Sequence, residues 1–125
     1  GPQTLWPDHC IQGSHGSAFH RLLDIPQTEL ILRKGFRHEV DSYSAFFEND
    51  HVTPTGLGGY LKERRFTRIF LVGLAFDYCV RYSAEDAVNL GFDTVVIEDA
   101  CKAIDLNGSA EATRSLFRHH GIELI

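Results

Sequence analysis

Two short apolar runs on either side of a helical pattern restrict the fold of this chain more than any other feature. The runs are residues 69–72 (Ile-Phe-Leu-Val) and 94–97 (Thr-Val-Val-Ile), and each has the length of a buried strand. Between them, the segment from Val80 to Leu90 carries apolar residues at helical spacing and is followed by Gly91, which suits a helix C-terminus. A strand, a helix and a second strand in this order predict parallel strands joined by a right-handed crossover.

The same alternation extends along the rest of the chain. After a loop-rich stretch over the first 27 residues, the patterns predict a strand at 29–34, a helix from Pro54 to about Arg65, a strand at 68–74, a helix at 109–119 and a strand at 122–125. The segment 36–52 has no clean periodicity, so we expect a long loop with a helical turn near 44–47. Together these elements predict an α/β fold, a doubly wound parallel sheet between two helical layers in a three-layer α/β/α sandwich.

Composition excludes several classes of protein. A chain of 125 residues with 43% hydrophobic content can bury one core, which indicates a single domain or part of one. Twelve basic against seventeen acidic side chains give a formal net charge of −5, which argues against a nucleic-acid partner. We find no apolar run of membrane-spanning length and no signal peptide. The cysteines at 10, 79 and 101 are odd in number and widely spaced, so a cytoplasmic location is expected.

Cys79 is the main catalytic candidate. It follows the predicted strand 68–74 and falls in the first turn of the next helix, and parallel sheets bind ligands outside the carboxyl ends of their strands. The N–H groups and positive dipole end of a helix stabilise a thiolate there and can bind an oxyanion. Asp77 is a suitable N-cap for that helix. The alternative is that Cys79 is a small buried hydrophobe.

Lys34 and two aromatic residues are weaker candidates. Lys34 ends the predicted strand 29–34, where it would favour the thiolate of Cys79 if the two side chains meet. Taken alone, it is a strand-end lysine that reaches water. Trp6, in a loop with proline beside it, and Tyr43, in the long loop, carry rings that can stack on an aromatic ligand or simply pack.

His9 is a candidate metal ligand. Its neighbours Asp8 and Cys10 cannot join it in one site, because adjacent residues of an extended chain point to opposite faces. A metal would therefore need further ligands from elsewhere. His15 and His20 are weaker candidates for the same role, and an ordinary surface histidine explains His9 equally well.

Three segments together resemble the nicotinamidases, also called pyrazinamidases, within the isochorismatase-like cysteine hydrolases. They are 6–10 (Trp-Pro-Asp-His-Cys), 34–35 (Lys-Gly) and 73–80 (Gly-Leu-Ala-Phe-Asp-Tyr-Cys-Val), and the likeness extends over essentially all 125 residues. The resemblance implies hydrolysis of nicotinamide, and of pyrazinamide, to the acid and ammonia through a cysteine thioester, in NAD salvage. It implies a small-molecule substrate and one divalent metal ion (zinc, iron or manganese) that holds the pyridine nitrogen, and it leaves a homo-oligomer open.

The resemblance also implies roles for individual residues. Cys79 matches the nucleophile and Lys34 the lysine of an Asp-Lys-Cys triad. The backbone N–H groups of Ala75 and Cys79 match the oxyanion hole, and the Leu74–Ala75 peptide matches a cis bond. His9 matches one metal ligand. The substrate pocket would be lined by Trp6, Tyr43, Leu74 and Ala75.

The family's catalytic aspartate and its other metal ligands belong to a segment ahead of the Trp-Pro pair, and no such segment precedes Gly1. We therefore expect residues 1–125 to be a partial isochorismatase-like domain, about its carboxyl-terminal two-thirds, and to be inactive in isolation. Two other functions stay open. One is a related hydrolase acting on a ureido or carbamoyl amide, and the other is a non-catalytic binding domain on a Rossmann-like scaffold.

Overall fold

A computed structural model of the chain describes residues 2–125, and Gly1, part of the predicted N-terminal loop, lies outside the described residues. The chain divides into two compact units, Gly1–Ile31 and Leu32–Ile125, each of which is described by itself. The first unit consists of loops and turns, as expected, apart from one turn of 3-10 helix, η1 (His15–Ser17). Local backbone hydrogen bonds close its turns.

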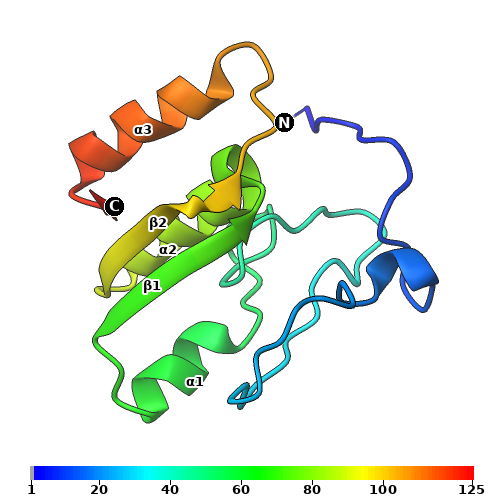
Figure 1. Cartoon of the computed structure of the whole chain (residues 1–125), viewed down its shortest axis with the longest axis horizontal. Coiled ribbons are helices and arrows are strands. Elements are labelled where there is room, and N and C mark those ends of the chain that lie inside the picture. Colours follow the sequence, from blue (N-terminus) through cyan, green and yellow to red (C-terminus); the bar gives the residue numbers. More distant parts are fainter. Residues whose placement is uncertain (1) are drawn as a thin grey trace. The chain divides into compact units, whose positions relative to one another are not determined.

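The second unit is built on a parallel sheet (Figure 1). Its strands are β1 (Arg68–Leu74), β2 (Asp93–Lys102) and β3 (Glu123–Leu124), hydrogen-bonded in the order β1-β2-β3. Helix α2 (Arg81–Asn89) connects the first pair of strands and α3 (Ser109–His120) the second. The predicted α/β fold with a parallel sheet is confirmed.

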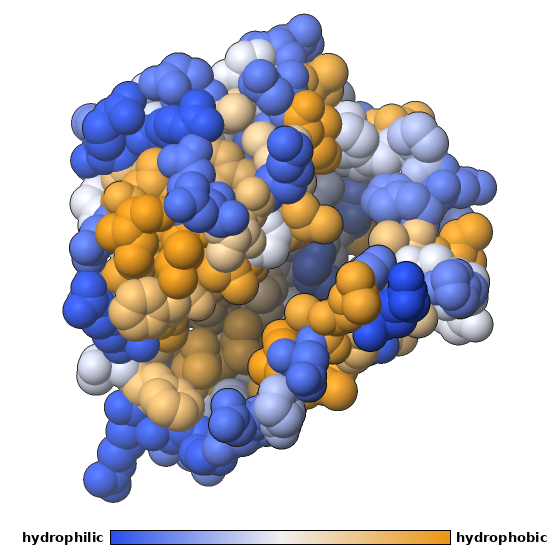
Figure 2. Space-filling model, viewed as in Figure 1, coloured by the Kyte–Doolittle hydropathy of each residue, from blue (hydrophilic) through white to orange (hydrophobic). Residues whose placement is uncertain are grey.

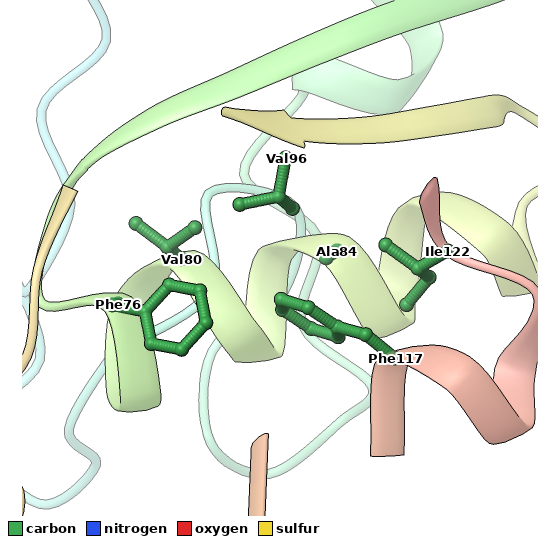
Figure 3. Packing of buried hydrophobic residues seen from close by; sticks show 6 residues of the cluster. All are labelled: Phe76, Val80, Ala84, Val96, Phe117 and Ile122. Atoms are coloured by element: carbon green, nitrogen blue, oxygen red, sulfur yellow. The ribbon is translucent and has the colours of Figure 1, made fainter. Parts of the chain in front are cut away.

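Both connecting helices pack on the same face of the sheet. The strands follow one another in one direction, and right-handed crossovers then place successive helices on one side. Figure 3 shows the consequence, because Val96 of β2 points toward both Ala84 of α2 and Phe117 of α3. The rings of Phe76 and Phe117 meet edge to face, with centroids 5.6 Å apart. The core of the unit therefore lies between the sheet and these two helices.

Among the core residues, Phe117 is the one whose truncation should lower the free energy of unfolding most. Its side chain is fully buried and meets residues from the sheet, α2 and the turn before α2. We expect Phe117→Ala to lower the free energy of unfolding by about 3–5 kcal/mol, because the lost ring leaves a cavity. Denaturant unfolding would measure this, with Ser115→Ala, an exposed position on the same helix, as the control. A loss below about 1 kcal/mol would contradict the packing described.

The prediction of a strand at 29–34 is wrong. Residues 29–34 form no strand, and Leu30 and Ile31 are 40% and 59% exposed. The segment does have the apolar pattern of a strand. A strand also needs a backbone partner, however, and none of the described residues pairs with this segment.

The first helix is shorter than predicted, and the helical turn expected near 44–47 is absent. Helix α1 (Leu57–Glu63) begins after Gly56, whose φ of 99° a glycine tolerates best. Pro54, the predicted start of the helix, instead forms an antiparallel bridge with Phe47. Since the bridge holds the backbone extended at Phe47 and at Pro54, no helix forms at either residue.

The remaining boundaries follow the prediction more closely. Strand β1 has the predicted bounds, and α3 ends one residue later than predicted, before Gly121 with a φ of 70°. Strand β2 extends beyond the predicted run 94–97, so that residues 99–101 also belong to it. They pair with the end of β1 after a register shift, which sets Cys101 opposite Gly73.

The face of β1 that points away from the helices is largely bare. Phe70, Val72 and Leu74 alternate along it and are 54%, 55% and 72% exposed. Figure 2 shows apolar side chains gathered over this part of the sheet. Contiguous apolar surface of this kind usually marks a place where further polypeptide or a ligand binds. Within residues 2–125, no helix has the length and apolar character to cross a membrane.

Candidate active site

The turn between β1 and α2 has an unusual backbone. The Leu74–Ala75 peptide is cis, as the resemblance implied, and a π-helical turn, η2 (Phe76–Val80), follows it. Val80 N donates to Ala75 O at 3.0 Å, which spans five residues instead of four. Single π-helical turns of this kind are frequent at functional sites. Cys79, half-buried, is the fourth residue of the turn. Its predicted place directly after β1 is therefore confirmed, but in a π-helical turn, which is wider than the first turn of an α-helix.

Lys34 lies beside Cys79 although 45 residues separate them in sequence. Lys34 Nζ is 3.6 Å from Cys79 Sγ. The same ammonium donates a hydrogen bond to the backbone carbonyl of Ser42, which fixes its direction. The sequence predicted that a strand end would position the lysine. The structure positions it through the carbonyl of Ser42 instead. A partly buried ammonium at this distance stabilises negative charge that develops on the sulfur.

Tyr43 brings an aromatic cluster to the same place. Its ring lies edge-on to Tyr78, with centroids 5.7 Å apart, and tilted against Tyr82 at 5.4 Å. Its backbone N–H donates to Asn49 Oδ1 at 3.0 Å, which holds the loop in shape. The cluster offers flat apolar surface next to the cysteine. Of the other two pocket candidates in this unit, Leu74 is largely exposed and Ala75 is half-buried.

Asp77 does not act as the N-cap that the sequence predicted. No side chain caps the start of the turn, and the Asp77 carboxylate is 1% exposed. It accepts hydrogen bonds from Ile104 N at 3.0 Å, Asp105 N at 2.8 Å and Ser109 Oγ at 2.5 Å. Sequence could not distinguish the two roles, because an aspartate at the start of a helix suits both.

The pKa of Asp77 follows from these contacts. Burial alone would raise the pKa of the carboxyl group, but the hydrogen bonds from Ser109, Ile104 and Asp105 outweigh burial and hold the pKa below its ordinary value of 3.8. A depressed folded-state pKa contributes stability that is fully present above the ordinary value. That contribution is lost as the pH falls through the folded-state pKa.

Ser83 is a residue of the site that the sequence did not single out. Its Oγ donates to Cys79 O at 2.6 Å and accepts from Ala45 N at 2.9 Å. The first contact has a local signal, since a helical serine often bonds the carbonyl four residues earlier. The second joins segments 38 residues apart and has no local signal.

Trp6 and His9 belong to the first unit. Trp6 is half-buried, and His9 is exposed, with Nδ1 2.6 Å from Pro7 O. A carbonyl only accepts, so Nδ1 is the donor of this hydrogen bond, and Nε2 is the ring nitrogen that remains for a metal. Metal-ligating histidines are commonly oriented by such a bond. No group of three or more His, Cys, Asp or Glu side chains that could hold a metal occurs within residues 2–125.

Comparison with known proteins identifies relatives over nearly the whole chain. The family model described as Isochorismatase domain matches residues 2–125. A nicotinamidase of Acinetobacter baylyi is 54% identical over 111 residues, which is 89% of this chain and 52% of that protein. The chain thus spans about half the length of the curated relatives it matches.

Solved structures agree with this match. An Acinetobacter baumanii nicotinamidase/pyrazinamidase superposes with a TM-score of 0.97 at 56% identity, over 98% of this chain and 59% of that one. PnC1 from L. infantum, solved in complex with nicotinate, gives 0.92 at 37% identity, over 97% and 60%. The pyrazinamidase of Pyrococcus horikoshii, solved with zinc, gives 0.82 at 29% identity, over 97% and 63%.

Proposed function

Since the chain belongs to the isochorismatase domain family, we propose that its protein is an amidohydrolase that converts nicotinamide, and pyrazinamide, to the acid and ammonia. The observation that carries this proposal is the pair formed by Lys34 Nζ and Cys79 Sγ, 3.6 Å apart at the end of β1. The named nicotinamidases among the relatives and the nicotinate bound to PnC1 support the choice of substrate.

In the proposed reaction the sulfur of Cys79 attacks the amide carbon and forms a thioester. The thiol proton goes to an aspartate that the resemblance assigns to a segment ahead of Trp6. The same group returns the proton to the nitrogen as the carbon–nitrogen bond breaks and ammonia leaves. Water then attacks the thioester carbonyl, releases the acid and regenerates the thiol. Lys34 stabilises the thiolate before attack.

The other site residues keep the roles that the resemblance gives them. We propose that the N–H groups of Ala75 and Cys79 bind the oxyanion that forms on the amide oxygen. Tyr43, Leu74 and Ala75 keep the pocket-lining role that the resemblance gives them, and Trp6 keeps the same assignment. The aromatic contacts of Tyr43 beside the cysteine support a flat ring as the ligand.

A divalent metal ion is part of the proposal, with His9 as one ligand through Nε2 and the remaining ligands in other segments. The orientation of the His9 ring by Pro7 O and the zinc in the Pyrococcus horikoshii pyrazinamidase support it. When bound, the metal would hold the pyridine nitrogen of the substrate. The identity of the metal, zinc, iron or manganese, is a question for metal analysis of the purified protein.

His9→Ala tests the metal assignment directly. In the full-length protein we expect metal affinity to fall by at least about 10–100-fold, the cost of removing even a residue that only supports a ligand. Chelator competition and metal content per protomer would measure it. His119→Ala is the control, because His119 is exposed near the end of α3 and is not a candidate ligand. Equal metal retention in both variants would remove His9 from the site.

We further propose that residues 1–125 are part of a longer domain whose other residues cover the outer face of β1. The exposed Phe70 and Val72 support this, as does the length of the relatives. The three free cysteines support a cytoplasmic location. A homo-oligomer stays a prediction. Full turnover by the 125-residue polypeptide alone would contradict the partial-domain proposal.

The experiment for the proposed function is ammonia release by the full-length protein from nicotinamide, pyrazinamide and a ureido amide, with and without chelator. We expect turnover of the two ring amides and its reduction by chelation. Turnover of the ureido compound alone would support the related hydrolase. A folded, metal-loaded protein that turns over none of them would support the non-catalytic binding domain.

A further inference from the structure

Asp77 is a buried carboxylate two residues before the proposed nucleophile, and it accepts three hydrogen bonds from donors outside its own turn. They are the N–H groups of Ile104 and Asp105 and the hydroxyl of Ser109. A buried charge is costly unless it is hydrogen-bonded, so the three donors hold the carboxylate in one position. Asp77 therefore fixes the π-helical turn to the segment between β2 and α3.

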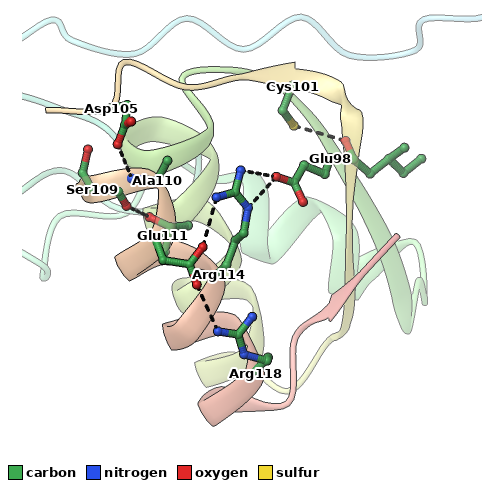
Figure 4. Close-up of polar contacts among 10 residues, drawn as sticks. Glu98, Cys101, Asp105, Ser109, Ala110, Glu111, Arg114 and Arg118 are labelled. Atoms are coloured by element: carbon green, nitrogen blue, oxygen red, sulfur yellow. Dashed lines mark hydrogen bonds and ion pairs between the residues drawn. The ribbon is translucent and has the colours of Figure 1, made fainter.

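The segment that receives Asp77 is itself held in place. Asp105 Oδ1 accepts from Ala110 N at 3.2 Å, which ties the segment to the first turn of α3 (Figure 4). Farther along α3, Arg114 pairs with Glu98 of β2 at 2.7 Å and with Glu111 at 3.2 Å. The segment that binds Asp77 is thus connected to α3, and α3 is connected to the sheet.

Ser83 holds the other side of the turn. Its hydroxyl joins the carbonyl of Cys79 to the N–H of Ala45. Ala45 lies three residues after Ser42, whose carbonyl accepts the hydrogen bond from Lys34. The contacts of Ser83 therefore connect the cysteine backbone to the loop that directs the lysine.

We propose that Asp77, with Ser83, is a positioning residue that sets the distance between Cys79 Sγ and Lys34 Nζ. Asp77 bonds the 104–109 segment and Ser83 bonds Ala45, and neither side chain has a hydrogen bond to the thiol. The inference rests on the proposed function only for its kinetic test, since the distance between thiol and ammonium matters for any reaction of the thiolate. A displacement of about 1 Å in such a pair can cost about 100-fold in rate.

The test uses Asp77→Asn in the full-length protein. The amide keeps the shape of the carboxylate but turns one acceptor into a donor that faces the donors of the 104–109 segment. We expect kcat for nicotinamide to fall by about 10–100-fold with KM unchanged. We also expect the pH profile of Cys79 alkylation by iodoacetamide to move to higher pH, because the ammonium no longer sits against the sulfur.

A matched control separates positioning from stability. Thr94→Val removes a hydroxyl that is 2% exposed and donates to Phe92 O, at the start of β2 and away from the turn. It should lower stability, because a buried hydrogen bond is lost, yet leave kcat and the alkylation profile unchanged. If Asp77→Asn fails to fold, Ser109→Ala, which removes one donor, should move kcat and the alkylation profile in the same direction by less.

The outcomes are distinct for the two proposals. A wild-type protein without amidase activity contradicts the proposed function, and the alkylation profile still tests the positioning role. An active wild type with unchanged kcat and profile in Asp77→Asn, or in Ser109→Ala where Asp77→Asn does not fold, overturns the inference. Equal changes in Asp77→Asn and Thr94→Val would also overturn it, since stability would then account for both.

Discussion

Cys79→Ala is expected to reduce nicotinamide turnover by the full-length enzyme by roughly 10⁵–10⁶-fold, the scale seen when a covalent nucleophile is removed. The methyl group cannot form a thioester, and the neighbouring ammonium of Lys34 has nothing to activate. Binding of the ring amide should remain measurable, because the aromatic residues beside the turn are unchanged. Ammonia release gives the rate, and calorimetry with nicotinate gives the binding.

Cys101→Ala is the matched control for this variant. Cys101 is also half-buried and free, but its thiol donates to Ile97 O at 3.3 Å and burial raises its pKa. An unactivated thiol of this kind is not expected to react. Cys101→Ala should therefore keep its activity, and retained activity in Cys79→Ala would end the nucleophile assignment.

Lys34→Met has the second largest expected effect. The substitution keeps the length and apolar stem of the side chain and removes the charge beside the sulfur together with the hydrogen bond to Ser42 O. We expect kcat/KM to fall by roughly 10²–10³-fold, comparable to the loss of one electrostatic contact to a reacting group. Alkylation of Cys79 by iodoacetamide should slow at neutral pH, because less thiolate is present.

Two further variants sharpen the lysine test. Lys34→Arg retains a positive charge but presents a planar, bulkier group, so it should recover only part of the activity. Lys62→Met removes an exposed lysine from α1 and should change nothing. Equal kinetics in Lys34→Met and the wild type would mean that the ammonium plays no part in the reaction.

The sequence predicted the sheet and its crossovers where local pattern and tertiary contact agree. Strand β1 has its predicted bounds, since its apolar run lies between Arg68 and the glycine at 73. Helix α3 ends before Gly121, whose positive φ a glycine tolerates best. The strand at 29–34 failed for the opposite reason, because a strand depends on a partner that local pattern cannot reveal.

The candidate site was predictable only in part. Cys79 could be found from its place after β1, and Lys34 was expected near it from the same rule. The structure brings the two together, but through the carbonyl of Ser42 and without a strand under the lysine. The contacts of Asp77 and the contact of Ser83 with Ala45 escaped sequence analysis, since they join segments 27 to 38 residues apart. Contacts of that range are decided by the fold as a whole.

The central claim is that Cys79 forms a covalent bond with the acyl group of the substrate. Intact-mass measurement of the full-length protein, acid-quenched during turnover of nicotinamide, tests it most directly, with peptide mapping to locate the adduct. The account predicts a mass increase of one nicotinoyl group on the peptide that contains Cys79, absent from Cys79→Ala. An adduct on another residue, or rapid turnover with no adduct at the earliest quench times, would contradict it.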